Sequence, residues 1–141
     1  RYAPLHGIDV PEQHVPDMID EFPVLFIAAA CAHGATRVTG AHELRVKESD
    51  RIATMAAGLR ALDVDLDEAE DGATIRGRAG GALGGNARID SHGDHRIAMA
   101  FAVAAQRSGS PVTVDDVANV ATSFPGFESL ARGVGFGLTT A

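Results

Sequence analysis

The sequence contains a single cysteine, only 12 lysine and arginine residues against 19 acidic ones, and no long apolar run. Cys31 cannot form a disulfide within the chain, and we expect it to be a buried thiol of a protein from a reducing compartment. The net charge of −7 leaves no basic stripe that could release phosphate counterions. We therefore expect neither nucleic acid nor an anionic membrane as a partner.

No apolar stretch approaches the roughly 18 residues that a membrane-spanning helix needs, and we identify no signal peptide. These observations favour a cytoplasmic location. The length of 141 residues corresponds to about one domain. Because the first residue is Arg1 rather than methionine, we expect a piece of a longer protein.

Hydrophobic spacing and turn residues predict a mixed α/β fold. We expect Asp20 to cap a helix that Gly34 ends, and Asp94 to cap a helix that reaches Gln106 and presents the stripe Ile97, Ala98, Phe101, Ala102 and Ala105. Residues 49–62 form a third predicted helix, and residues 127–132 a short fourth one. Strands are predicted at residues 35–40, 64–67, 73–77, 87–90 and 111–114, with an irregular lead-in or weak edge strand before residue 15 and loops at 41–47 and 80–85.

The order of these elements repeats after about 75 residues. Helix, strand, loop and helix follow Asp20, and the same series follows Asp94. The repeat suggests a duplicated unit of type βαβαββ, with units at about residues 15–78 and 86–141 and the second one incomplete.

Two charged segments, residues 45–51 and 93–96, each stand directly before a predicted helix. Helix N-termini favour anions, and arginine adds a planar fork that matches carboxylate or phosphate. The basic candidates are therefore Lys47, Arg51 and Arg96, although each alone could be a solvated surface charge.

The acidic candidates near helix starts are Asp20, Glu48, Asp50 and Asp94. The alternative to a chemical role is N-capping, which fits Asp50 and Asp94 well. A second alternative is a metal site at His92, Asp94 and His95, but zinc requires three or four ligands, and the other histidines show no matching spacing.

The segment Arg-Val-Lys-Glu-Ser-Asp-Arg at 45–51, together with Asp-His-Arg at 94–96 and Asp-Met-Ile-Asp-Glu-Phe-Pro at 17–23, resembles the C-terminal third of the 5-enolpyruvylshikimate-3-phosphate synthase family (3-phosphoshikimate 1-carboxyvinyltransferases). The resemblance implies two similar domains built from βαβαββ units, of which the chain would supply about two units of one domain. It also implies transfer of the enolpyruvyl group of phosphoenolpyruvate to shikimate 3-phosphate, with release of phosphate and no metal or organic cofactor.

The same resemblance implies roles for six residues. Asp20 corresponds to the base at the attacking hydroxyl, and Glu48 to the acid that protonates the methylene carbon. The anions would be bound by the remaining four, Lys47, Arg51, His95 and Arg96. The missing N-terminal portion of the enzyme would supply further contacts, so we expect the isolated chain to be inactive.

Two departures from the family pattern stand out. Thr122 occupies the place of a lysine that binds phosphoenolpyruvate in many members, and Glu43-Leu44 replaces Asn-Trp. Two other readings stay open at this level, a metal-dependent hydrolase using His92, Asp94 and His95, and a non-catalytic repeat domain.

Overall fold

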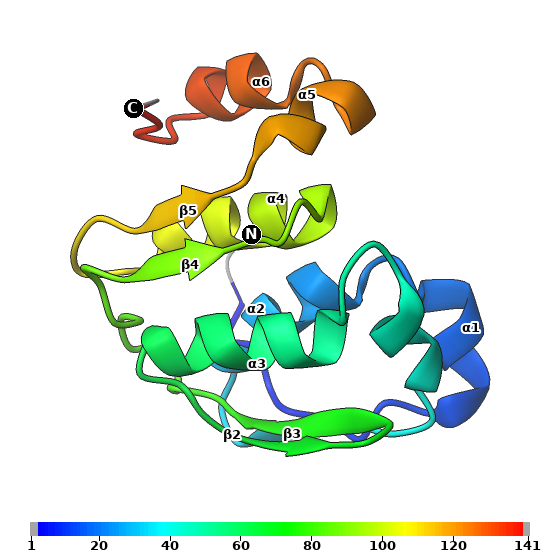
Figure 1. Ribbon diagram of the computed structural model, residues 1–141. Coiled ribbons are helices and arrows are strands. Elements are labelled where there is room, and N and C mark those ends of the chain that lie inside the picture. Colours follow the sequence, from blue (N-terminus) through cyan, green and yellow to red (C-terminus); the bar gives the residue numbers. More distant parts are fainter. Residues whose placement is uncertain (1–2, 140–141) are drawn as a thin grey trace.

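The computed structural model describes residues 3–139, which form two small sheets with α2 and α3 between them and α5 and α6 outside the smaller sheet (Figure 1). The larger sheet is antiparallel, with strands in the order β1 (Ala35–Val38), β3 (Gly72–Arg76) and β2 (Asp65–Ala69). The smaller sheet pairs β4 (Arg88–Asp90) with β5 (Thr113–Asp115) in parallel. The helices are α1 (Val15–Met18), α2 (Phe22–Cys31), α3 (Arg51–Ala61), α4 (His95–Ala105), α5 (Ala118–Ser123) and α6 (Phe127–Gly133), with short 3-10 helices at Glu12–His14 and His42–Val46. The mixed α/β class is therefore confirmed.

The core lies where α2, α3 and α4 pack on one another, with α2 and α3 also packed on the larger sheet and α4 on β5. Its largest buried apolar side chains include Phe22, Phe26, Ile52, Met55, Leu59, Ile75, Ile97 and Phe101. Gly58 lets α3 approach α4 closely, since a Cβ atom at this position would lie 2.2 Å from Cζ of Phe101. The two helices that follow the charged segments are thus packed side by side.

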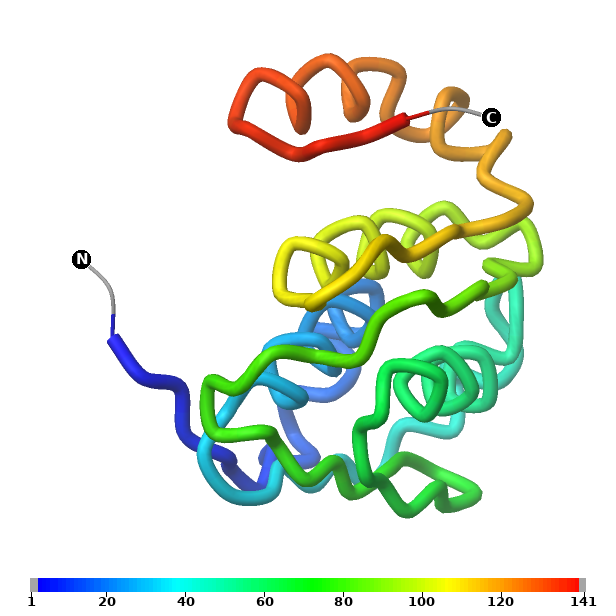
Figure 2. The backbone as a smooth tube through the Cα atoms, turned by 90° about the vertical axis from the view of Figure 1, so that its left-hand side faces the viewer, coloured from blue at the N-terminus to red at the C-terminus, as the bar shows by residue number. Residues whose placement is uncertain are grey.

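Part of the lead-in, residues 6–10, runs alongside β1 and the turn before it without forming a regular strand. Parallel bridges join His6 to His33 and Asp9 to Arg37. At the other end of the chain, α5 and α6 lie beyond β5, on the side away from the larger sheet (Figures 1 and 2). In both sheets a helix, α2 or α4, therefore connects two segments that pair in parallel.

Several details differ from the sequence predictions. Asp20 does not cap α2, which begins at Phe22 after Glu21 and has no side-chain cap bond, because the Asp20 carboxylate instead bonds an arginine of α3. Cys31 is partly exposed rather than buried. In α4 the inward positions include Ala100 and Ala104, whereas Ala102 and Ala105 are only partly buried.

Four helical segments within the described residues were not predicted from the sequence. The lead-in, expected to be irregular or a weak edge strand, contains a 3-10 helix at Glu12–His14, and α1 precedes the first predicted helix. Residues 41–47, predicted as a loop, contain a 3-10 helix, and α5 follows β5 where no helix was predicted. The predicted caps Asp50 and Asp94 are confirmed, since the first accepts a bond from the amide of Ala53 and the second from those of Arg96 and Ile97. None of the helices within residues 3–139 is long and apolar enough to cross a membrane.

Candidate active site

The side chain of Arg51 is the centre of the charged site, and it is only 1% exposed. Its three guanidinium nitrogens donate to three different carboxylates. Nε lies 2.8 Å from Oδ2 of Asp94, Nη1 2.9 Å from Oδ1 of Asp20, and Nη2 2.7 Å from Oε2 of Glu48. The predicted alternative of a solvated surface charge is therefore wrong for Arg51. The desolvation of this side chain would lower its pKa, but the bonds to Asp94 and Asp20 outweigh burial and raise it.

Asp94 is the one fully buried carboxylate among these three partners. Oδ1 accepts bonds from the backbone N–H groups of Arg96 (3.0 Å) and Ile97 (3.4 Å), as an N-cap of α4 does. Oδ2 accepts from Arg51 and from the hydroxyl of Ser49 (3.1 Å). Burial alone would raise the pKa of Asp94, but these donors, led by Arg51, more than offset it and hold the pKa below its usual value.

Asp20 lies between two guanidinium groups. Besides its bond to Arg51, its Oδ2 is 3.6 Å from Nη2 of Arg96, and its backbone carbonyl accepts from Nη1 of Arg96 at 2.9 Å. The same Nη1 also donates to Oε1 of Glu21 at 3.1 Å. The bond from Arg51, with the charges of Arg96 and Lys47, lowers the pKa of Asp20. The Asp20 side chain remains 48% exposed, so solvent or a ligand can reach it.

Lys47 stands at the end of the 3-10 helix and pairs with Glu43, whose Oε1 is 2.5 Å from Nζ. Glu43 is one of the two departures from the family pattern. In this structure, therefore, the predicted ligand-binding ammonium of Lys47 is already paired with a carboxylate.

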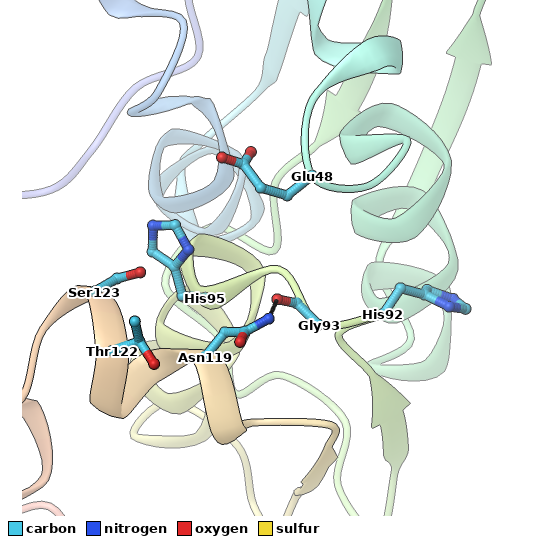
Figure 3. Close-up of a pocket in the computed structure, with 7 residues that line it drawn as sticks. All are labelled: Glu48, His92, Gly93, His95, Asn119, Thr122 and Ser123. Atoms are coloured by element: carbon cyan, nitrogen blue, oxygen red, sulfur yellow. Dashed lines mark hydrogen bonds between the residues drawn. The ribbon is translucent and has the colours of Figure 1, made fainter.

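A depression of about 420 Å³ opens beside the N-terminus of α4 (Figure 3). It is lined by Glu48, His92, Gly93, His95, Asn119, Thr122 and Ser123. Glu48 and His95 face the hollow from one side and the α5 residues from the other, whereas the His92 ring points away (Figure 3). The amide of Asn119 donates to the carbonyl of Gly93 at 2.7 Å and so ties α5 to the turn before α4.

A smaller depression of about 160 Å³ lies next to it and is lined by Asp20 and Arg96 among others. Asp20 and Glu48 thus border different hollows, joined through the guanidinium of Arg51. The structure gathers all six predicted site residues around the N-termini of α3 and α4. The sequence analysis missed Asn119 and Ser123, because α5 is a single short helix without an apolar stripe that could have predicted it.

The site offers no metal-ligand set. Within residues 3–139 no group of three histidine, cysteine, aspartate or glutamate side chains could hold a metal ion. Both oxygens of Asp94 are already bound by N–H and O–H donors, and His92 points away from His95. The hypothesis of a metal-dependent hydrolase therefore has no support in the geometry.

Comparison with known proteins gives a consistent result. The sequence pattern of the family described as EPSP synthase (3-phosphoshikimate 1-carboxyvinyltransferase) matches residues 1–130. A protein named 3-phosphoshikimate 1-carboxyvinyltransferase from Xanthomonas euvesicatoria pv. vesicatoria is 67% identical over 141 residues, which are 100% of this chain and 31% of the relative. Its namesake from Xanthomonas campestris pv. campestris (strain 8004) is 68% identical over 139 residues, 99% of this chain and 31% of the relative.

Solved structures agree with these relatives. The structure of EPSP synthase from Acinetobacter baumannii superimposes with a TM-score of 0.90 at 51% identity, covering 94% of this chain and 31% of that one. The chain thus spans about a third of the length of the proteins that it matches.

Proposed function

The chain belongs to the EPSP synthase (3-phosphoshikimate 1-carboxyvinyltransferase) family, and from this membership we propose that it forms the C-terminal third of an enolpyruvyl transferase. The full-length enzyme transfers the enolpyruvyl group of phosphoenolpyruvate to the 5-hydroxyl of shikimate 3-phosphate and releases phosphate, a step in the biosynthesis of aromatic amino acids. The observation that carries the proposal is the convergence of Asp20, Glu48, Arg51 and Arg96 at the N-termini of α3 and α4.

The reaction needs two proton-handling groups. Addition of an alcohol to the enol carbon of phosphoenolpyruvate requires a base at the hydroxyl oxygen and an acid at the methylene carbon. We assign the base to Asp20, because Arg51 and Arg96 orient its carboxylate while about half of the side chain stays accessible to a substrate hydroxyl. Glu48 lines the larger hollow and is 52% exposed, so it is the accessible carboxylate for the carbon side.

Both substrates are anions, and fixed cations must bring them together. His95 lines the larger hollow and Arg96 the smaller one. Arg51 lies behind Glu48 and Asp20, which border them. We assign these three cations to phosphoenolpyruvate. Lys47 is assigned to shikimate 3-phosphate, whose phosphate would replace the Glu43 carboxylate at Nζ. Thr122, which lines the larger hollow, stands in this assignment where many family members have a lysine.

The proposal includes the organisation of the chain. We propose about two βαβαββ units of one domain in a two-domain enzyme, at residues 15–78 and 86–141. The bridges at His6 and Asp9 support an earlier start of the first unit, since the lead-in supplies the segment that runs alongside β1. The remainder of the same enzyme is the expected partner, the cytoplasm the expected location, and no nucleic acid or membrane is expected to bind.

The test uses the full-length enzyme that contains this chain. Wild type is expected to release phosphate only when both substrates are present, while the 141-residue chain alone releases none. Glu48→Gln and Asp20→Asn should each lower kcat by about 10²- to 10⁴-fold. Asp17→Asn is the matched control, because this exposed carboxylate three residues before Asp20 lies outside both hollows.

Two results would contradict the proposal. One is the absence of enolpyruvyl transfer by the full-length wild type. The other is wild-type turnover by Glu48→Gln, which would favour a non-catalytic role for this part of the chain.

A further inference from the structure

The three carboxylates around Arg51 are not equivalent, and burial separates them into two kinds. The side chain of Asp94 is 0% exposed, whereas those of Asp20 and Glu48 are 48% and 52% exposed. The bond distances to the guanidinium are nevertheless similar, at 2.8, 2.9 and 2.7 Å. Distance alone therefore does not distinguish them, but access to solvent does.

The bond between Arg51 and Asp94 cannot be exchanged at low cost. Separation of the two groups would leave the Asp94 carboxylate without its counter-ion in a site that water does not reach, which destabilises a protein strongly. Asp94 is also immobilised by three further donors, the hydroxyl of Ser49 and the backbone N–H groups of Arg96 and Ile97. The carboxylate is thus held in place before it binds the guanidinium.

The other two bonds can be exchanged. The Asp20 and Glu48 carboxylates are each about half exposed (48% and 52%), so water can hydrate them when they leave the guanidinium, whereas it cannot hydrate Asp94. A ligand carboxylate or phosphate that reaches Nη1 or Nη2 can replace Glu48 or Asp20 without moving the guanidinium, since Nε stays bound to Asp94.

We infer that Asp94 is a positioning residue for anion binding, the permanent counter-ion that fixes Arg51 while Asp20 and Glu48 hold it by replaceable bonds. The inference rests on the proposed function, in which Arg51 binds phosphoenolpyruvate. It also explains how two segments 43 positions apart in the sequence, ending at Arg51 and beginning at Asp94, act as one unit. When the anion displaces Glu48, that carboxylate becomes free for proton transfer.

The test compares Asp94→Asn with Asp50→Asn in the full-length enzyme. Both substitutions remove one charge from a helix N-cap, but Asp50 caps α3 and pairs with Arg45 rather than Arg51. Asp94→Asn should raise the KM for phosphoenolpyruvate by roughly 10- to 100-fold, the effect of a lost hydrogen bond to a charged group. The KM for shikimate 3-phosphate should change by less than about twofold, and Asp50→Asn should leave both constants near wild type. Equal effects of the two variants on both constants would overturn the inference.

A second measurement does not depend on turnover. Exchange of the Arg51 Nε proton with water, followed by NMR, should be slow in wild type and in Glu48→Gln and fast only in Asp94→Asn. Fast exchange in Glu48→Gln together with slow exchange in Asp94→Asn would refute the permanent role of Asp94. If wild type shows no enolpyruvyl transfer, the proposed function fails, and this exchange experiment still decides the positioning role.

A milder variant covers the case in which Asp94→Asn does not fold. Ser49→Ala removes one neutral donor from Oδ2 of Asp94 and should raise the KM for phosphoenolpyruvate by roughly threefold. An unchanged KM in Ser49→Ala, in a folded protein, would count against the inference.

Discussion

The junction of α3 and α4 and the C-terminal pair α5–α6, of which α5 lines the larger hollow, are built in opposite ways. At the junction, Arg51 and Asp94 are fully buried and saturated with partners. In residues 116–139 only Ala131 is buried, while apolar side chains such as Phe124, Leu130 and Val134 are exposed. Few buried contacts mean low local stability, so within this chain we expect the α5–α6 wall to be displaced more easily than the junction, which we call the rigid wall.

The contrast suggests that the two walls of the site have different roles. The rigid wall carries the groups whose charge and orientation must be fixed, and the α5 wall carries neutral donors such as Thr122 and Asn119. Asn119 is the side chain that ties the second wall to the first, through the carbonyl of Gly93. Ligand-binding segments that move are drawn from the less stable part of a protein.

The largest expected effect comes from Arg51→Met, which leaves the Asp94 carboxylate buried without its counter-ion. We expect a loss of about 3–5 kcal/mol in the free energy of unfolding, measured by urea denaturation. The matched substitution Arg132→Met in α6 breaks only an exposed pair with Glu128 and should change it by less than about 1 kcal/mol. Equal losses of unfolding free energy in the two variants would contradict the difference in stability between the two walls.

An added methyl group should destabilise the junction of α3 and α4 more than it destabilises α6. Gly58→Ala places a Cβ atom 2.2 Å from the Phe101 ring and should destabilise by about 1–3 kcal/mol through overpacking. Gly133→Ala in α6 meets nothing within 4 Å and should be neutral or slightly stabilising. Thermal unfolding of both variants measures this difference, and a neutral Gly58→Ala would show that α3 and α4 pack more loosely.

Low pH should reduce the stability that the carboxylates at the junction of α3 and α4 contribute. The pKa values of Asp94 and Asp20 are lower in the folded chain than the ordinary value of 3.8. The stability that these groups contribute is therefore present above about pH 4 and is lost as the pH falls through their folded pKa values. The free energy of unfolding should be measured from about pH 5 down to about pH 2. It should fall less steeply with decreasing pH in Asp94→Asn than in wild type. Parallel curves would contradict the assignment.

The smallest effect is expected for an apolar truncation in α6. The Leu130 side chain is 57% exposed, so Leu130→Ala should change the free energy of unfolding of the chain by less than about 0.5 kcal/mol. Leu59→Ala in the core is the counterpart and should destabilise by about 2–5 kcal/mol. A large loss for Leu130→Ala would mean that α6 is held more firmly than its exposure indicates.

Much of the fold could be predicted from local patterns. The apolar spacing of α3 and the caps Asp50 and Asp94 involve residues only a few positions apart, so they can be recognised in the sequence without knowledge of the fold. The limits of the strands shifted by only one or two residues from the predicted ones. The helix α5 escaped prediction, because six residues without an apolar stripe give no periodic signal.

The candidate site divides in the same way. The sequence by itself determined which residue types stand at the N-termini of two helices, and the family motif carried by those residues indicated their chemistry. Only the tertiary structure decided that Arg51 is buried, that Asp20 bonds it instead of capping α2, and that Asp94 lies behind it. The physical reason is distance along the chain: these bonds join residues 31 and 43 positions apart, and such pairs form only when α2, α3 and α4 pack into one core.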